Sequence, residues 1–182
     1  MTRENVVLNE CETISLPLVT MSNGITIRLY DPYDMTHAQK IVCQLIPCID
    51  VYKQMGFDTI VVPATKPIPL AWFLALHSQL NLVILKKEIK PYYFKFKEFT
   101  CKSITSDNKN TMYITEEDYN MLNNHKVIFF DDVLSTGATY EASKKFLIEE
   151  CNITELKSLF VLKEGDSYKA DKNIKWLGSI PI

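Results

Sequence analysis

The hydrophobic pattern of this chain centres on four apolar residues in a row, Val127–Phe130, all of them β-branched or aromatic. Such a run is typical of a strand buried in a parallel sheet. Two carboxylates, Asp131 and Asp132, follow where the strand is expected to end. A turn of small residues comes next, and Tyr140–Glu150 has the apolar spacing of a helix. The segment therefore predicts the order strand, acid pair, hydroxyl-rich turn and helix.

The same alternation of strand and helix patterns recurs along the chain. Further strands are predicted near residues 57–62, 81–85 and 158–162. Helical spacing is found at Asp34–Met55, which Pro47 is expected to kink or split, and at Leu70–Gln79. Strands that alternate with helices predict an α/β fold, a parallel sheet with helices on both faces. Ligands of such sheets bind at the carboxyl ends of the strands.

Three segments lie outside this repeat. Residues 1–30 predict two strands around the turn Ser22–Gly24 and form an N-terminal accessory segment. Residues 93–122 predict a hairpin flap whose polar tip, 103–110, is expected to be flexible. Residues 163–182 form a C-terminal hood segment that ends in a further apolar stretch. We expect the 182 residues to form one domain with these segments attached to it.

Composition narrows the classes of function. The apolar fraction is 47% and the formal charge is −2, which argues against an extended nucleic-acid surface. No apolar run is long enough for a membrane helix, and the first residues lack the apolar core of a signal peptide. The five cysteines are irregularly spaced, as is typical of free thiols in a reducing compartment. We therefore expect a cytoplasmic protein without nucleic-acid or membrane partners.

The turn after the acid pair has the chemistry of a phosphate site. Unpaired backbone N–H groups and the helix dipole favour an anion at a helix N-terminus, and small side chains let a phosphate approach. Asp131 and Asp132 would repel a phosphate alone, so they suit a ligand that also carries hydroxyl groups or a metal ion. The alternative is a buried strand followed by an ordinary N-capped helix.

The residues DDVLSTGAT, from Asp131 to Thr139, resemble the phosphoribosyl-pyrophosphate (PRPP) motif of the type I phosphoribosyltransferases. The resemblance implies that Asp131 and Asp132 are the catalytic acids and hold the ribose hydroxyls. It implies a 5′-phosphate loop made of Ser135, Thr136, Gly137, Ala138 and Thr139.

A second stretch, Pro63–Ala71, is similar to the pyrophosphate loop of purine-type members, and it carries Thr65 and Lys66. Ala64 stands where those members have a glutamate, and Pro67 stands where they have a glycine. Proline has no N–H to offer an anion, so one amide contact to pyrophosphate is lost. The alternative is a plain connection from a strand to a helix.

A third stretch is similar to the family segment R-K-x-x-K-x-Y, with Lys86 in the arginine position. Lys87, Lys90 and Tyr92 match the rest of that pattern. Three lysines at the end of a strand suit the several charges of pyrophosphate, although such a cluster can also be a solvated loop.

The resemblance implies an enzyme that transfers 5-phosphoribosyl from PRPP to a nucleobase nitrogen, most simply a purine, for nucleotide salvage. Mg²⁺ would be bound mainly through PRPP, with no metal site formed by the protein alone, and the chain would be a homodimer. Trp176 could stack on the base or could simply pack in the core. The alternative function is a PRPP-binding regulatory or catalytically degenerate protein of the same fold, which Ala64 and Pro67 favour.

Overall fold

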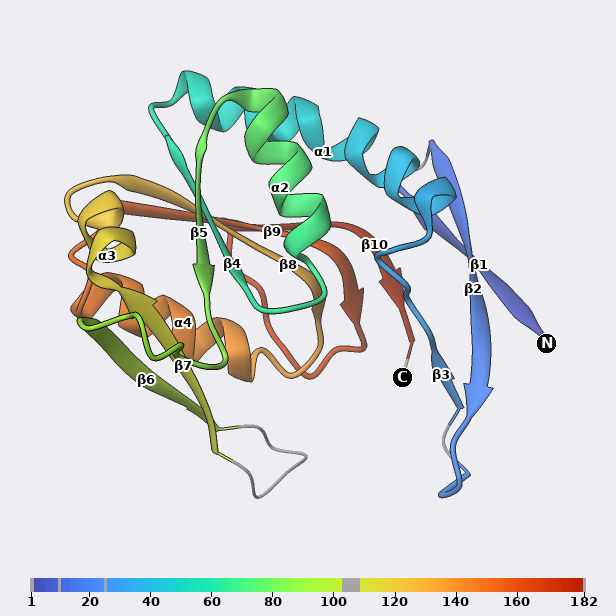
Figure 1. The fold of residues 1–182 in the computed structure, drawn as a ribbon. Helices are drawn as coiled ribbons and strands as arrows, with labels where there is room; N and C mark the ends of the chain where they lie inside the picture. The colour runs from blue at the N-terminus through green and yellow to red at the C-terminus, as the bar shows by residue number, and fades with distance from the viewer. Residues whose placement is uncertain (1, 10, 25, 103–108, 182) are drawn as a thin grey trace.

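The central element is a five-stranded parallel sheet at the middle of the molecule (Figure 1). A computed structural model describes residues 2–9, 11–24, 26–102 and 109–181 of the chain. The strands of the sheet, in spatial order, are β10 (Ile174–Ile180), β9 (Glu155–Glu164), β8 (Lys126–Leu134), β4 (Thr59–Pro63) and β5 (Asn81–Leu85). The predicted parallel sheet is therefore confirmed.

Helices cover both faces of this sheet, as the alternating strand and helix patterns predicted (Figure 1). Ile128 and Phe130 of β8 pack in one cluster with helices α1 (Met35–Gln54) and α2 (Ile68–Ser78). Val127 and Phe129 point the other way, into a cluster with α4 (Ala138–Glu149). Successive residues of a strand face opposite sides, so a strand covered on both faces must be apolar throughout.

Of the two outcomes predicted for Pro47, a kink or a split, the split is wrong, because helix α1 is continuous. The Asp34 side chain caps the helix by accepting from the backbone N–H of Thr36 at 3.0 Å. Pro47 removes the hydrogen bond that the carbonyl of Cys43 would accept. Cys43 is exposed, so water can hydrogen-bond to that carbonyl instead.

The N-terminal segment forms a three-stranded antiparallel sheet of β1 (Arg3–Leu8), β2 (Glu12–Thr20) and β3 (Thr26–Arg28). The sequence predicted two of these strands and missed β1. This small sheet lies along β10, where the Asn9 backbone N–H donates to the Leu177 carbonyl at 2.8 Å (Figure 1). At the crossing, a Cβ on Gly178 would lie 2.8 Å from the Val7 carbonyl oxygen, so only glycine permits this approach.

The predicted flap is a hairpin of β6 (Phe96–Lys102) and β7 (Lys109–Thr115), followed by the short helix α3 (Glu116–Leu122). The hairpin packs on the α4 side of the sheet, where the rings of Phe99 and Phe146 stack with centroids 4.3 Å apart. The tip for which we predicted flexibility lies outside the described residues, apart from its end at 109–110. Within the described ranges, no helix is long and apolar enough to cross a membrane.

Candidate active site

The three segments singled out in the sequence converge on one edge of the sheet. Strands β4, β5 and β8 are parallel neighbours, and they end at Pro63, Leu85 and Leu134. The carboxyl ends of parallel strands meet at the same edge, so the loops that follow these strands lie next to one another. The topology thus brings the acid pair, the small-residue turn and the two basic loops together.

The acid pair lies within β8, because this strand continues to Leu134 instead of ending at Phe130. Asp131 is paired in register with Phe160 of β9. The side chain of Asp131 accepts from the Asp132 backbone N–H at 2.9 Å, and that of Asp132 accepts from the Val133 N–H at 2.9 Å. Neighbouring residues of a strand point to opposite faces, so the two carboxylates flank the strand end.

The charge of the acid pair is poorly compensated by the protein. Burial raises the pKa of Asp131 well above its ordinary value, and the neighbouring charge of Asp132 raises it further. The ammonium group of Lys87 opposes this shift only in part. A cation, or a ligand that donates hydroxyl groups, would relieve the unfavourable burial of this carboxylate. The pair is therefore suited to a ligand of this kind.

The turn after β8 forms a small concave site of about 90 Å³, lined by Asp131, the run 133–140 and Phe160. Gly137 is the N-cap residue of α4, with φ of 76° and no side chain to cap the helix, and the Thr136 hydroxyl accepts from the Ala138 N–H only at 3.5 Å. Among the described residues, no backbone carbonyl accepts from the N–H groups of Thr139 or Tyr140. These amides and the positive end of the helix dipole favour an anion such as a phosphate.

Gly137 is required in this turn for two reasons. Its φ of 76° lies in the left-handed region that side chains with a Cβ rarely adopt. A Cβ at this position would also lie 2.2 Å from a ring carbon of Tyr168. The shape of the turn therefore depends on Gly137, which has no side chain, and on the ring of Tyr168, which is remote in sequence but fills the adjacent space.

The loop between β4 and α2 exposes Thr65 and Lys66 at the same edge of the sheet. Its start is fixed by the Ala64 N–H, which donates to the Leu85 carbonyl at 2.9 Å, and the Ala64–Thr65 peptide bond is cis. Pro67 is the N-cap residue of α2 with φ of −76°, a value that proline adopts without strain. Polar contacts from this loop must therefore come mainly from Thr65 and Lys66.

The structure separates the three lysines after β5. Lys86 forms an ion pair with Asp118 of α3, and Lys90 pairs with Glu88 at 2.6 Å. Lys87 is exposed and is close enough to Asp131 to affect its pKa. Among these lysines, Lys87 is therefore the one best placed to meet an anion beside the acid pair. Tyr92 is exposed, with its ring 4.8 Å from that of Tyr93.

Curated sequences resemble the chain at moderate identity. A HGPRTase-like protein of Halorubrum lacusprofundi is 28% identical over 128 residues, which are 69% of this chain and 64% of that protein. A hypoxanthine/guanine phosphoribosyltransferase of Methanothrix thermoacetophila is 30% identical over 109 residues, 60% of this chain and 52% of that protein. The chain thus spans less than two thirds of the length of these relatives. No family model matches it.

Solved structures of adenine phosphoribosyltransferases superpose on most of the chain. The one from Thermoanaerobacter pseudethanolicus has a TM-score of 0.66 at 19% identity and covers 91% of this chain and 95% of its own. The one from Saccharomyces cerevisiae, complexed with an imino-altritol bisphosphate and adenine, has a TM-score of 0.67 at 18% identity and covers 81% and 84%. The fold is that of the type I phosphoribosyltransferases. The resemblance that the sequence showed to this family is therefore confirmed.

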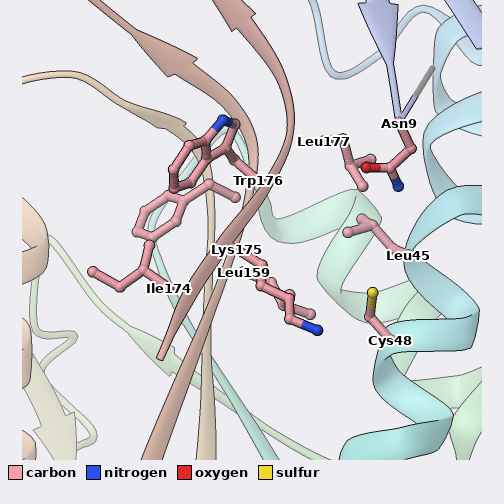
Figure 2. Close-up of a pocket in the computed structure, with 9 residues that line it drawn as sticks. Asn9, Leu45, Cys48, Leu159, Ile174, Lys175, Trp176 and Leu177 are labelled. Atoms are coloured by element: carbon pink, nitrogen blue, oxygen red, sulfur yellow. The ribbon is translucent and has the colours of Figure 1, made fainter. Parts of the chain in front are cut away.

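A larger cavity of about 250 Å³ lies beside β10, which is an edge strand of the central sheet (Figure 2). Trp176 lines this cavity, and its indole N–H donates to the Ser179 hydroxyl at 3.1 Å. Phe160 lines this cavity and also the small site beside Asp131. Asp131, Phe160 and Trp176 are paired in register across β8, β9 and β10, so they form one row across the sheet.

Sequence reasoning missed two tyrosines near the site. Tyr30 follows β3, and its buried hydroxyl has no hydrogen-bond partner among the described residues. Burial and the nearby charge of Asp132 raise the pKa of this phenol. Tyr168 contacts the turn at Gly137 from the segment between β9 and β10. Neither tyrosine lies in a recognisable motif, and both are remote in sequence from the site, so only folding brings them close to it.

Replacing Asp131 by Asn should stabilise the ligand-free protein at pH 7. When folding raises the pKa of a carboxyl group, the folded protein becomes less stable as the pH rises above the ordinary pKa of that group, which is 3.8. Asparagine carries no charge and avoids this loss, so the gain should vanish at about pH 3, where the carboxyl group is largely protonated in both states. Urea unfolding at both pH values measures the effect, with Asp50→Asn on the exposed side of α1 as the control. A loss of stability at pH 7 would contradict burial as the cause of the shift.

Replacing Gly137 by Ala should destabilise the protein by about 3 kcal/mol, because left-handed strain and overpacking against Tyr168 add together. Gly24→Ala is the matched control, since its φ of 82° is similar but nothing lies within 4 Å of the added Cβ. This control should cost about 1 kcal/mol. Urea unfolding of both variants measures the difference, and equal losses would show that the ring of Tyr168 does not constrain the turn.

Proposed function

We propose that this protein is a phosphoribosyltransferase that transfers 5-phosphoribosyl from PRPP to a ring nitrogen of a purine, with release of pyrophosphate, in nucleotide salvage. The observation that carries the proposal is the poorly compensated acid pair at the end of β8, directly beside an uncapped helix N-terminus. This pairing suits a ligand with hydroxyl groups at one end and a phosphate at the other. The relatives at 28% and 30% identity support the same activity.

The two ends of the ribose phosphate would be held by adjacent parts of β8 and α4. Asp131 and Asp132 would accept hydrogen bonds from the ribose hydroxyls. The turn Ser135–Thr139 would hold the 5′-phosphate through its backbone N–H groups and hydroxyls. With both ends fixed, the C1 atom of the sugar is presented to the acceptor, and this positioning supplies much of the catalysis.

The pyrophosphate would lie over the loops that follow β4 and β5. Thr65, Lys66 and Lys87 are exposed there and would supply a hydroxyl and two positive charges. We place Lys86, Lys90 and Tyr92 further from the pyrophosphate. Lys86 and Lys90 are each paired with a carboxylate. The bond from C1 to the pyrophosphate oxygen breaks as the bond from the purine nitrogen forms, and the proton on that nitrogen passes to solvent. Charge on the leaving group is what the lysines stabilise.

The acid pair also fits Mg²⁺, because carboxylate and hydroxyl oxygens are the ligands that this ion prefers. Among the described residues, no cluster of three or more His, Cys, Asp or Glu side chains could hold a metal. The ion would therefore be held mainly by PRPP oxygens, with Asp131 and Asp132 as the protein's contribution. When bound, Mg²⁺ supplies positive charge to the pyrophosphate.

The acceptor base would lie near Trp176. The row formed by Asp131, Phe160 and Trp176 spans three neighbouring strands, about 10 Å at the usual strand spacing. A purine is large enough to bridge between the sugar site and the indole. Aromatic stacking on Trp176 would favour a flat heterocycle and leave the identity of the purine to polar groups.

The alternative function, a PRPP-binding regulator without turnover, is favoured by Ala64 and Pro67 in the loop after β4. Pro67 offers no N–H to the pyrophosphate, so leaving-group stabilisation there is weaker than a glycine would allow. Binding of the ribose phosphate does not depend on this loop, so a protein of this kind could bind PRPP without reacting. The two functions differ only in the release of pyrophosphate.

The decisive experiment combines the protein with PRPP, Mg²⁺ and, in turn, adenine, hypoxanthine, guanine, xanthine, uracil and orotate, and measures pyrophosphate. We expect release with at least one purine and not with the pyrimidines. Lys87→Ala should reduce kcat/KM by about tenfold or more, because it removes a charge beside the leaving group. Lys145→Ala, on the exposed side of α4, is the control. PRPP binding without release with any base would favour the regulator.

We further propose that the protein is a homodimer that pairs through α2. This helix is apolar on nearly all sides, yet Trp72, Phe73 and Leu76 are 59%, 46% and 64% exposed. A helix of this composition normally has both sides covered. The loops that follow β4 and β5 adjoin this helix in the chain, so a partner placed there would lie near the pyrophosphate site.

Trp72→Glu tests the dimer. A charge at the centre of an apolar interface should shift the protein to monomers at micromolar concentration. Sedimentation velocity of the parent and of the variant measures the change, with Lys145→Glu as the control for added negative charge. A monomeric parent, or a variant that sediments as the parent does, would exclude this interface.

A further inference from the structure

Tyr168 contacts the phosphate loop and the first turn of α4 at three points. One ring edge lies against Gly137, where an added Cβ would be 2.2 Å from a ring carbon. The ring also packs edge-on against Tyr140, with centroids 6.0 Å apart. The phenol hydroxyl donates to the carboxylate of Glu141. One half-buried side chain from the C-terminal segment thus holds three of the first residues of this helix.

These contacts lie outside the anion site itself. The residues that line the small site do not include Tyr168 or Glu141. Tyr168 therefore contacts the turn without lining the anion site. A side chain in that place acts on a ligand only through the residues it holds.

Glu141 gives this contact a consequence for anion binding. Its carboxylate is in the first turn of α4, where it interacts favourably with the helix dipole but repels a phosphate bound at the same end. Lys144 approaches the carboxylate at 3.9 Å and is shared with Asp171 at 3.9 Å, so its compensation is incomplete. Burial and the hydrogen bond to Glu141 raise the pKa of Tyr168, so the phenol remains a donor at neutral pH.

We propose that Tyr168 is a positioning residue for the phosphate loop: its ring fixes the turn at Gly137, and its hydroxyl holds the Glu141 carboxylate away from the anion. The inference rests on the proposed function, because the anion is taken to be the 5′-phosphate of a ribose ligand. It adds a residue from the segment between β9 and β10 to a site otherwise formed by the ends of β4, β5 and β8.

A purely structural role makes a different prediction. If Tyr168 only fills space, Tyr168→Phe keeps the ring and should leave phosphate binding unchanged. If the hydroxyl restrains Glu141, Tyr168→Phe frees the carboxylate and weakens binding, but only while Glu141 is charged. The second substitution Glu141→Gln therefore separates the two roles.

Calorimetric titration with ribose 5-phosphate measures binding to the parent, Tyr168→Phe, Glu141→Gln and the double variant. We expect Tyr168→Phe to raise Kd about threefold, the scale of one partly screened charge beside the phosphate. Glu141→Gln should bind as tightly as the parent or more tightly, and the double variant should match Glu141→Gln. Equal binding by Tyr168→Phe and the parent would overturn the role of the hydroxyl. So would an equal loss of affinity when Tyr168→Phe is made in the parent and in Glu141→Gln.

Hydrogen exchange of the ligand-free protein tests the ring separately. Tyr168→Ala should accelerate exchange by about tenfold at the Glu141 amide, which donates to the Gly137 carbonyl, while Tyr168→Phe leaves it unchanged, because only the first loses the contact with Gly137. Amides of β4 serve as the reference for global unfolding. Unchanged exchange in Tyr168→Ala would overturn the positioning role. A parent that binds neither ribose 5-phosphate nor PRPP would instead reject the proposed function, while this exchange result would still decide how Tyr168 acts.

Discussion

The burial of Asp131 beside a second carboxylate, Asp132, near the end of β8 is the constraint on which the rest of the site depends. Their charge is only partly balanced by Lys87, and burial together with the charge of Asp132 raises the pKa of Asp131. A folded protein keeps such a group only when another requirement outweighs its cost. In the proposed function, that requirement is a ligand whose hydroxyl groups or cation complete the site. The sheet provides the rigid position, because β8 is paired on both sides, with β4 and with β9.

The phosphate end of the site has the opposite character. It is formed by backbone amides and small side chains, and its shape depends on Gly137 and on the ring that lies against it. The acid end is fixed by strand pairing within the sheet, whereas the phosphate end is fixed by one contact with the C-terminal segment. A ligand that spans both ends must fit the rigid acid end on β8 and also the turn at Gly137, whose position depends on the C-terminal segment.

Local sequence signals predicted β5 with its correct bounds, Asn81–Leu85. Strand β8 was predicted too short, because aspartate is a poor strand former and pairing with β9 overrides that preference. The sequence also located the acid pair and the turn after it. It could not reveal that Lys86 is paired with Asp118, since that contact joins residues 32 positions apart. Tyr168 escaped notice for the same reason: its partner at Gly137 is remote in the chain.

The pairing of Lys86 with Asp118 has a consequence for how the hairpin β6–β7 can move. Lys86 is also bridged to Tyr113 through two backbone hydrogen bonds of 2.8 Å, so the base of the hairpin is fastened to the end of β5 by both main chain and side chain. Bending toward the site must therefore pivot beyond Tyr113, and also beyond Phe99, because the ring of Phe99 stacks on Phe146 of α4. Helix α3 and the base of the hairpin would stay in place during such a motion.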